Sequence, residues 1–194
     1  MEIKLSIGNN WVGAGHPTYI IAEISANHRQ IYSEAESLVR AAKDAGANAV
    51  KVQTYTADTL TIEADTRYFQ IGAETIWAGR TLYDLYQEAY MPWDWQPKLQ
   101  ALANNIGIDF FSTAYDNSAV DFLESMDVPV YKIASFELVD LPLIRRIAAT
   151  GKPAIISTGM ATLAEIDEAV RAFREVSETP FALLKCTSAY PAPA

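Results

Sequence analysis

The chain repeats one pattern, in which a short apolar run ends in polar residues and is followed by a segment with helical periodicity. From about Tyr19 onward the hydrophobic period alternates between 2 and 3.6, which is typical of repeated βα units around a parallel sheet. Five such runs are YIIAEISANH from Tyr19, AVKVQT from Ala49, DFFSTAYD from Asp109, VYKIASFE from Val130 and KPAIISTGM from Lys152, and FALLKCTS from Phe181 is predicted to form a sixth strand.

The number of these βα units limits which folds the chain can form. A closed (β/α)8 TIM barrel takes eight strands and about 250 residues, so six units in 194 residues predict an α/β chain that is the front portion of such a barrel in a longer protein. An open doubly wound sheet is the rival fold, but no GxGxxG phosphate loop follows the first run. Turn residues around Gly8 predict an N-terminal β-hairpin over residues 1–18 that closes the bottom of the barrel, which occupies residues 19–194.

Composition narrows the class of protein. Half of the residues are apolar, which is enough to build a core in one domain. The net charge of −9, from 15 basic and 24 acidic side chains, argues against a nucleic-acid or anionic-membrane partner. Cys186 is the single cysteine, no signal-peptide core opens the sequence, and no apolar run approaches the roughly 20 residues of a membrane span. We therefore expect a cytoplasmic protein.

Several helices carry sequence signals for their first turn. Capping boxes are predicted at Ser33 with Glu36 and at Thr162 with Glu165. Ser118 and Asp140 are predicted to cap the helices that follow them, since their side chains can accept from free backbone N–H groups.

The polar ends of the runs are where chemistry is expected, because the carboxyl ends of barrel strands converge on one mouth. Lys51 and Gln53 are two apart on one strand and so share a face. A lysine that faces inward is costly unless an anion compensates it. The strand ends together carry Glu23, Lys51, Gln53, Thr113, Lys132, Ser135, Glu137 and Ser157, a set that favours an enzyme with an anionic, phosphorylated substrate.

The residue types leave alternatives open at each position. Lys51 and Lys132 can clamp an anion, one of them can form a Schiff base if its pKa is depressed, or they can extend to solvent. Glu23 suits acid–base work, hydroxyl recognition or a lysine partner. Glu137 suits the same work or a solvated loop. His16 and His28 are the only histidines, and no metal-spaced cluster joins them.

The ordered motifs of this chain are similar to those of a known family. The segments IAEISANH, AGANAVKVQTY, FFSTAYD, VYKIASFE, GKPAIISTGMAT and LLKCTSAYPAPA resemble the N-terminal barrel of sialic acid synthases and their relatives, across nearly the whole chain. Within the family, TLYDLYQEAYMPWDWQPKL and CTSAYPAP are most similar to the branch that makes pseudaminic acid. The sialic acid and legionaminic acid branches typically carry Asn where this chain has Ser188.

The resemblance implies condensation of phosphoenolpyruvate with an amino-sugar aldehyde, here a 2,4-diacetamido-2,4,6-trideoxy hexose of the altrose type. It implies that Lys51, Gln53, Thr113, Lys132, Ser135 and Ser157 hold phosphoenolpyruvate. Glu23 and Glu137 would handle protons or sugar hydroxyls, and Ser188 and Tyr190 would meet the sugar.

The resemblance also implies a homodimer and a divalent metal, usually Mn²⁺, whose histidine ligands lie beyond Ala194, as does a C-terminal antifreeze-like domain. The alternatives are an N-acetylneuraminate or legionaminate synthase, a Schiff-base barrel aldolase, or an inactive truncated fragment.

Overall fold

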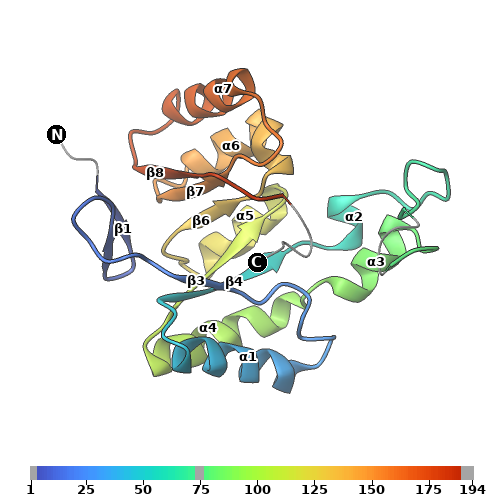
Figure 1. The fold of residues 1–194 in the computed structure, drawn as a ribbon, viewed down its shortest axis with the longest axis horizontal. Helices are drawn as coiled ribbons and strands as arrows, with labels where there is room; N and C mark the ends of the chain where they lie inside the picture. Colours follow the sequence, from blue (N-terminus) through green and yellow to red (C-terminus); the bar gives the residue numbers. More distant parts are fainter. Residues whose placement is uncertain (1–3, 73–76, 189–194) are drawn as a thin grey trace.

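A computed structural model describes residues 4–72 and 77–188 of the chain. Six parallel strands form one sheet, in the order β3-β4-β5-β6-β7-β8, which curls into a half-barrel (Figure 1). The strands are β3 (Ile21–Glu23), β4 (Ala49–Thr54), β5 (Asp109–Ala114), β6 (Tyr131–Ile133), β7 (Ala154–Ser157) and β8 (Phe181–Leu184). The predicted incomplete TIM barrel of six βα units is therefore confirmed.

Helices connect the strands and cover the outer face of the sheet. Figure 1 shows α1 and α4 beside β3 and β4, and α6 and α7 beside β7 and β8. The helices are α1 (Tyr32–Asp44), α2 (Ala57–Leu60), α3 (Leu82–Ala89), α4 (Gln96–Ile106), α5 (Asn117–Ser125), α6 (Leu141–Ala148) and α7 (Leu163–Arg174), with short 3-10 turns η1 (Trp93–Trp95) and η2 (Phe136–Val139). No helix within the described ranges combines the length and the apolar character that a membrane crossing requires.

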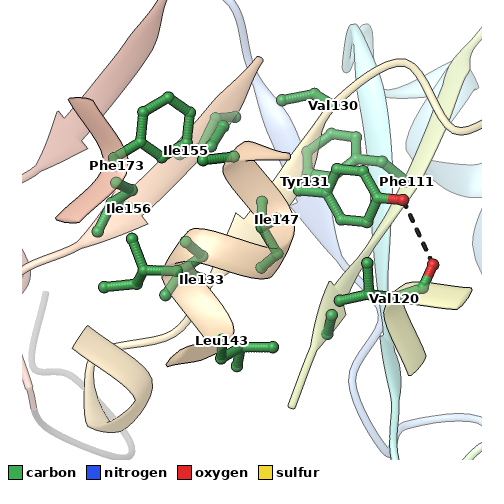
Figure 2. Close-up of a cluster of buried hydrophobic side chains, with 14 of the residues drawn as sticks. Phe111, Val120, Val130, Tyr131, Ile133, Leu143, Ile147, Ile155, Ile156 and Phe173 are labelled. Carbon is green, nitrogen blue, oxygen red and sulfur yellow. Dashed lines mark hydrogen bonds between the residues drawn. The ribbon is translucent and has the colours of Figure 1, made fainter. Parts of the chain in front are cut away.

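The hydrophobic core lies between the outer face of the sheet and these helices. Alternate residues of β4 and β5, such as Val50, Val52 and Phe110, pack against α1 and α4. Figure 2 shows the second part of the core, where Tyr131 and Ile133 of β6 pack near α6 and the Tyr131 hydroxyl donates to the Val120 carbonyl at 3.4 Å. Burial of each large apolar side chain stabilises the fold by roughly 1.5–3 kcal/mol. The packing of apolar side chains against the helices therefore determines which side chains of each strand point to the inner face.

The predicted hairpin is present as β1 (Leu5–Ile7) and β2 (Asn10–Val12), which pair antiparallel. It lies at the amino-terminal end of the sheet, where the Asp109 carboxylate accepts from Asn10 Nδ2 at 2.9 Å and from the Tyr19 hydroxyl at 2.6 Å. Leu5 and Ile7 of the hairpin are buried in the core. The hairpin thus covers the end of the half-barrel opposite the polar strand ends.

The helix caps agree with the sequence signals at two of four positions. Asp140 caps α6, and Thr162 forms the predicted capping box with Glu165. The prediction for Ser33 is wrong, because α1 begins at Tyr32 without a side-chain cap. The prediction for Ser118 is also wrong, since the Asp116 carboxylate accepts from the backbone N–H groups of residues 118 and 119.

The two edge strands of the described sheet are β3 and β8. Leu183 and Leu184 of β8 are 44% and 37% exposed. An apolar edge of a parallel sheet is a surface that proteins normally pair or cover.

Candidate functional site

The register of the central strands places three predicted site residues in one row. Gln53 of β4 pairs with Thr113 of β5, and Thr113 pairs with Lys132 of β6. One layer nearer the hairpin, Glu23 of β3 pairs with Lys51 of β4. These side chains lie on the face of the sheet opposite the helices, so the inner face of the half-barrel is polar at its carboxyl end.

Lys51 is held by two of the predicted residues. Its ammonium forms an ion pair with Glu23 and donates to Thr113 Oγ1 at 3.1 Å. The side chain of Lys51 is only 12% exposed, whereas that of Glu23 is 41% exposed. The second Glu23 oxygen, Oε1, accepts from the Ser25 backbone N–H at 3.0 Å. Of the roles considered for Glu23, a lysine partner is the one that this geometry displays.

Lys132 is more deeply buried and has only neutral partners. Its ammonium donates to Ser157 Oγ and to the Ile133 carbonyl, both at 2.6 Å. Burial lowers the pKa of Lys132 to about 8, and the nearby charge of Lys51 adds to the effect. The charges of Cys186, Glu23 and Glu137 oppose this shift but do not outweigh it, so the protein compensates the positive charge of Lys132 only in part.

Ser135, Cys186 and Ser188 gather around Gly159 in the loop after β7. The Gly159 backbone N–H donates to Ser135 Oγ at 3.1 Å. A Cβ built on Gly159 would lie 2.7 Å from Ser135 Oγ and 3.2 Å from Cys186 Cβ, and closer still to Ser188 Oγ. No room exists for a side chain at residue 159, so the glycine allows these groups to approach one another.

The Cys186 thiol lies among hydrogen-bond donors. Burial raises the pKa of this thiol, but donors from Ser157, the Thr158 backbone and Ser135 outweigh burial and bring the pKa below its usual value. The loops after β6 and β7 thus turn several hydroxyl and N–H groups toward one point, an arrangement suited to a negatively charged group.

Glu137 lies in η2, just past the end of β6. Burial raises the pKa of its carboxyl, while its own backbone N–H and the charge of Lys132 oppose that shift. Its Oε2 atom is buried and has no hydrogen-bond partner among the described residues. A carboxyl in this state can carry a proton, so the buried alternative for Glu137 fits the structure better than the solvated loop.

Some residues of this region carried no signal in the sequence. Tyr115 accepts a hydrogen bond from Gln53 Nε2 at 2.6 Å, and Ser25 Oγ donates to Gln53 Oε1 at 3.1 Å. Both lie just past the ends of strands and within the quoted motifs, which is the one feature that could have singled them out. Tyr190 lies outside the described residues.

The described side chains do not form a metal site. Within residues 4–72 and 77–188, no group of three or more His, Cys, Asp and Glu side chains is placed to hold a metal ion. His28 is fully buried, with burial lowering its pKa, and Nδ1 accepts from the Gln30 backbone N–H at 3.1 Å. The Mn²⁺ that the resemblance implies therefore finds no fitting ligand set among the described residues.

The fold and the inner face define an α/β barrel protein with two inward-facing lysines, Lys51 and Lys132, near its strand ends. Comparisons with known proteins show the family to which the fold belongs. A model of the NeuB family matches residues 38–194. A pseudaminic acid synthase of Helicobacter pylori is 43% identical over 175 residues, which cover 90% of this chain and 51% of that protein. A pseudaminic acid synthase of Campylobacter jejuni is 42% identical over 187 residues, covering 96% and 54%.

The fold is also similar to that of a solved structure. An N-acetylneuraminic acid synthetase from Leptospira borgpetersenii, crystallised with citrate, superimposes with a TM-score of 0.83 at 30% identity, over 100% of this chain and 62% of that one. The chain belongs to the NeuB family. It spans about half the length of the curated relatives that it matches.

A substitution at Gly159 tests the crowded loop cluster. Gly159→Ala places a methyl group against the Ser135 hydroxyl, and such overpacking costs roughly 1–3 kcal/mol. We expect the affinity of the full-length gene product for a small phosphate monoester, measured by calorimetry, to fall about tenfold or more. The matched control is Gly72→Ala, where a Cβ meets no atom within 4 Å. Equal affinities in both variants would contradict the assignment of this loop to the anion site.

The pKa of Lys132 predicts a pH dependence of anion binding. Below pH 8 the ammonium is already charged and affinity should be flat. Above about pH 8 the free protein holds a growing fraction of neutral lysine, so the Kd for a small phosphate monoester should rise by up to tenfold per pH unit. Titration calorimetry from pH 6.5 to 10 measures this Kd for the wild-type protein and for Lys132→Gln. The same steep rise in Lys132→Gln would assign the titration to another group.

Proposed function

We propose that this chain is the phosphoenolpyruvate-binding part of a nonulosonic acid synthase that makes pseudaminic acid. The observation that carries the proposal is the pair of inward-facing lysines, Lys51 and Lys132, on either side of Thr113. They concentrate positive charge at one point of a chain whose net charge is −9. The identity to the Helicobacter and Campylobacter synthases supports the choice of reaction.

Each predicted side chain has a role in this proposal. Lys51, Gln53, Thr113, Lys132, Ser135 and Ser157 hold the phosphate and the carboxylate of phosphoenolpyruvate. The bonds of Lys51 to Thr113 and of Lys132 to Ser157, and the bond that Ser135 accepts from the Gly159 backbone, preorganise these groups. Ser188 and Tyr190 are the residues proposed to bind the sugar. The proposal extends to a homodimer, a cytoplasmic location and a divalent metal, Mn²⁺, for which the described side chains offer no ligand set.

The proposed reaction joins C3 of phosphoenolpyruvate to the aldehyde carbon of a 2,4-diacetamido-2,4,6-trideoxy hexose of the altrose type. The π bond of the aldehyde breaks as the C–C bond forms, and the aldehyde oxygen takes up a proton to become a hydroxyl. Positive charge develops at C2, and water adds there and gives up a proton. The C2 hydroxyl then loses its proton as the C–O bond to phosphate breaks, which leaves the ketone of the product and inorganic phosphate. Lys51 and Lys132 balance the phosphate charge throughout. Glu137, whose burial raises the pKa of its carboxyl, is suited to hold the proton that the added water gives up, while Glu23 orients Lys51.

A Schiff-base aldolase is the second candidate, because one observation favours it. Burial and the charge of Lys51 lower the pKa of Lys132 to about 8, which is what an imine-forming lysine needs. Borohydride reduction in the presence of substrate separates the two functions. A covalent adduct on Lys132 supports the aldolase, whereas the synthase forms no imine.

Removal of either lysine should abolish turnover while the fold is kept. Each of Lys51→Ala and Lys132→Ala deletes a charge-assisted contact worth roughly 1.5–3 kcal/mol in binding, and more if the contact strengthens in the transition state. Phosphate release by the full-length gene product measures the effect. Lys185→Ala is the matched control, since Lys185 follows β8 and is exposed. Near-normal activity of both site variants would refute the anion clamp.

The sugar preference is a separate prediction. With Ser188 in place of the Asn typical of the other branches, the enzyme should prefer 6-deoxy-2,4-diacetamido-altrose over N-acetylmannosamine. Ser and Asn offer different donors and volumes, and an unpaired buried polar group costs about 1–3 kcal/mol. The kcat/KM values measured with the two sugars test this preference. An equal or higher value with N-acetylmannosamine would instead indicate a sialic acid synthase.

A further inference from the structure

The carboxamide of Gln53 is held at both of its ends. Ser25 Oγ donates to Oε1 at 3.1 Å, and Nε2 donates to the Tyr115 hydroxyl at 2.6 Å. The second N–H of Nε2 has no partner among the residues that the structure describes. Gln53 stands in the same row as Thr113 and Lys132, so its carboxamide lies on the inner face beside the two lysines.

The hydrogen bonds at the two ends of the amide give it one direction. Oε1 accepts from the Ser25 hydroxyl and Nε2 donates to the Tyr115 hydroxyl. Burial raises the pKa of the Tyr115 phenol, so the hydroxyl keeps its proton and accepts from Nε2 through an oxygen lone pair. Tyr115 is therefore the partner that holds the nitrogen end of the carboxamide.

The Tyr115 ring is fixed independently of its hydroxyl. It makes an edge-to-face contact with Tyr55, with ring centroids 5.4 Å apart. Tyr55 is itself buried, and its carbonyl accepts from Trp93 Nε1 at 3.1 Å. A phenylalanine at residue 115 would therefore keep the ring in place and remove only the hydrogen bond.

We infer that Tyr115 is a positioning residue of the condensation, which turns the Gln53 carboxamide so that one N–H faces the phosphoenolpyruvate anion. The inference rests on the proposed function. If the hydrogen bond is lost, the amide can rotate, and its oxygen then faces an anion for part of the time. Tyr115 thus acts through Gln53 and does not itself touch the reacting atoms.

The test is Tyr115→Phe in the full-length gene product. We expect the KM for phosphoenolpyruvate to rise about tenfold, while the KM for the sugar and the melting temperature stay within error of wild type. The control is Tyr83→Phe, which removes a hydroxyl that donates to Asp58 at 2.8 Å on an exposed helix face. It should change neither KM.

A double-variant comparison shows whether Tyr115 acts through Gln53. In a Gln53→Ala background, Tyr115→Phe should add no further loss, since no amide remains to be turned. Should Tyr115→Phe lower the melting temperature, Ser25→Ala probes the other end of the carboxamide and is expected to raise the same KM. An unchanged KM in Tyr115→Phe, or a full effect in the Gln53→Ala background, overturns the inference alone. Wild-type protein that releases no phosphate overturns the proposed function and the inference with it.

Discussion

The hydrogen-bonded register of β4, β5 and β6 is the constraint on which the candidate site depends. It sets Gln53, Thr113 and Lys132 in one row on the inner face. A slip of one residue in β6 would turn Lys132 into the helix-covered core and bring Tyr131 and Ile133 to the inner face. Because those two side chains are completely buried against the helices, the packing that stabilises the fold also fixes the position of the charge.

The inner face carries charge that the protein does not fully balance. Lys51 has Glu23 as its counter-ion, but the partners of Lys132 are a hydroxyl and a carbonyl. Burial and the nearby charge of Lys51 disfavour the charged form more than Cys186, Glu23 and Glu137 favour it, which is why the pKa of Lys132 falls to about 8. A bound anion would restore the balance, and this electrostatic deficit is the strongest physical support for a phosphorylated substrate.

The site was predictable to the extent that it depends on strand periodicity. Alternation places Lys51 and Gln53 on one face, and the strand ends locate Lys132 and Ser157. The partners were not predictable, because the ion pair of Lys51 with Glu23 and the orientation of Gln53 by Tyr115 join residues that are neighbours only after the strands pair. The helix cap predicted at Ser33 failed for a related reason. The chain enters α1 through a backbone turn, in which the Ile31 N–H donates to the His28 carbonyl at 2.8 Å, so the cap expected at Ser33 is not used.

The sequence by itself determined the alternation of strands and helices, the N-terminal hairpin and the polar character of the strand ends. These features follow from period and turn chemistry over a few residues, which the chain encodes locally. Only the tertiary structure decided which lysine has a counter-ion, which carboxyl is buried and which hydroxyls meet around Gly159. The physical reason is that desolvation and Coulomb energies depend on distances between strands far apart in the chain, and those distances exist only once the sheet has curled into its half-barrel.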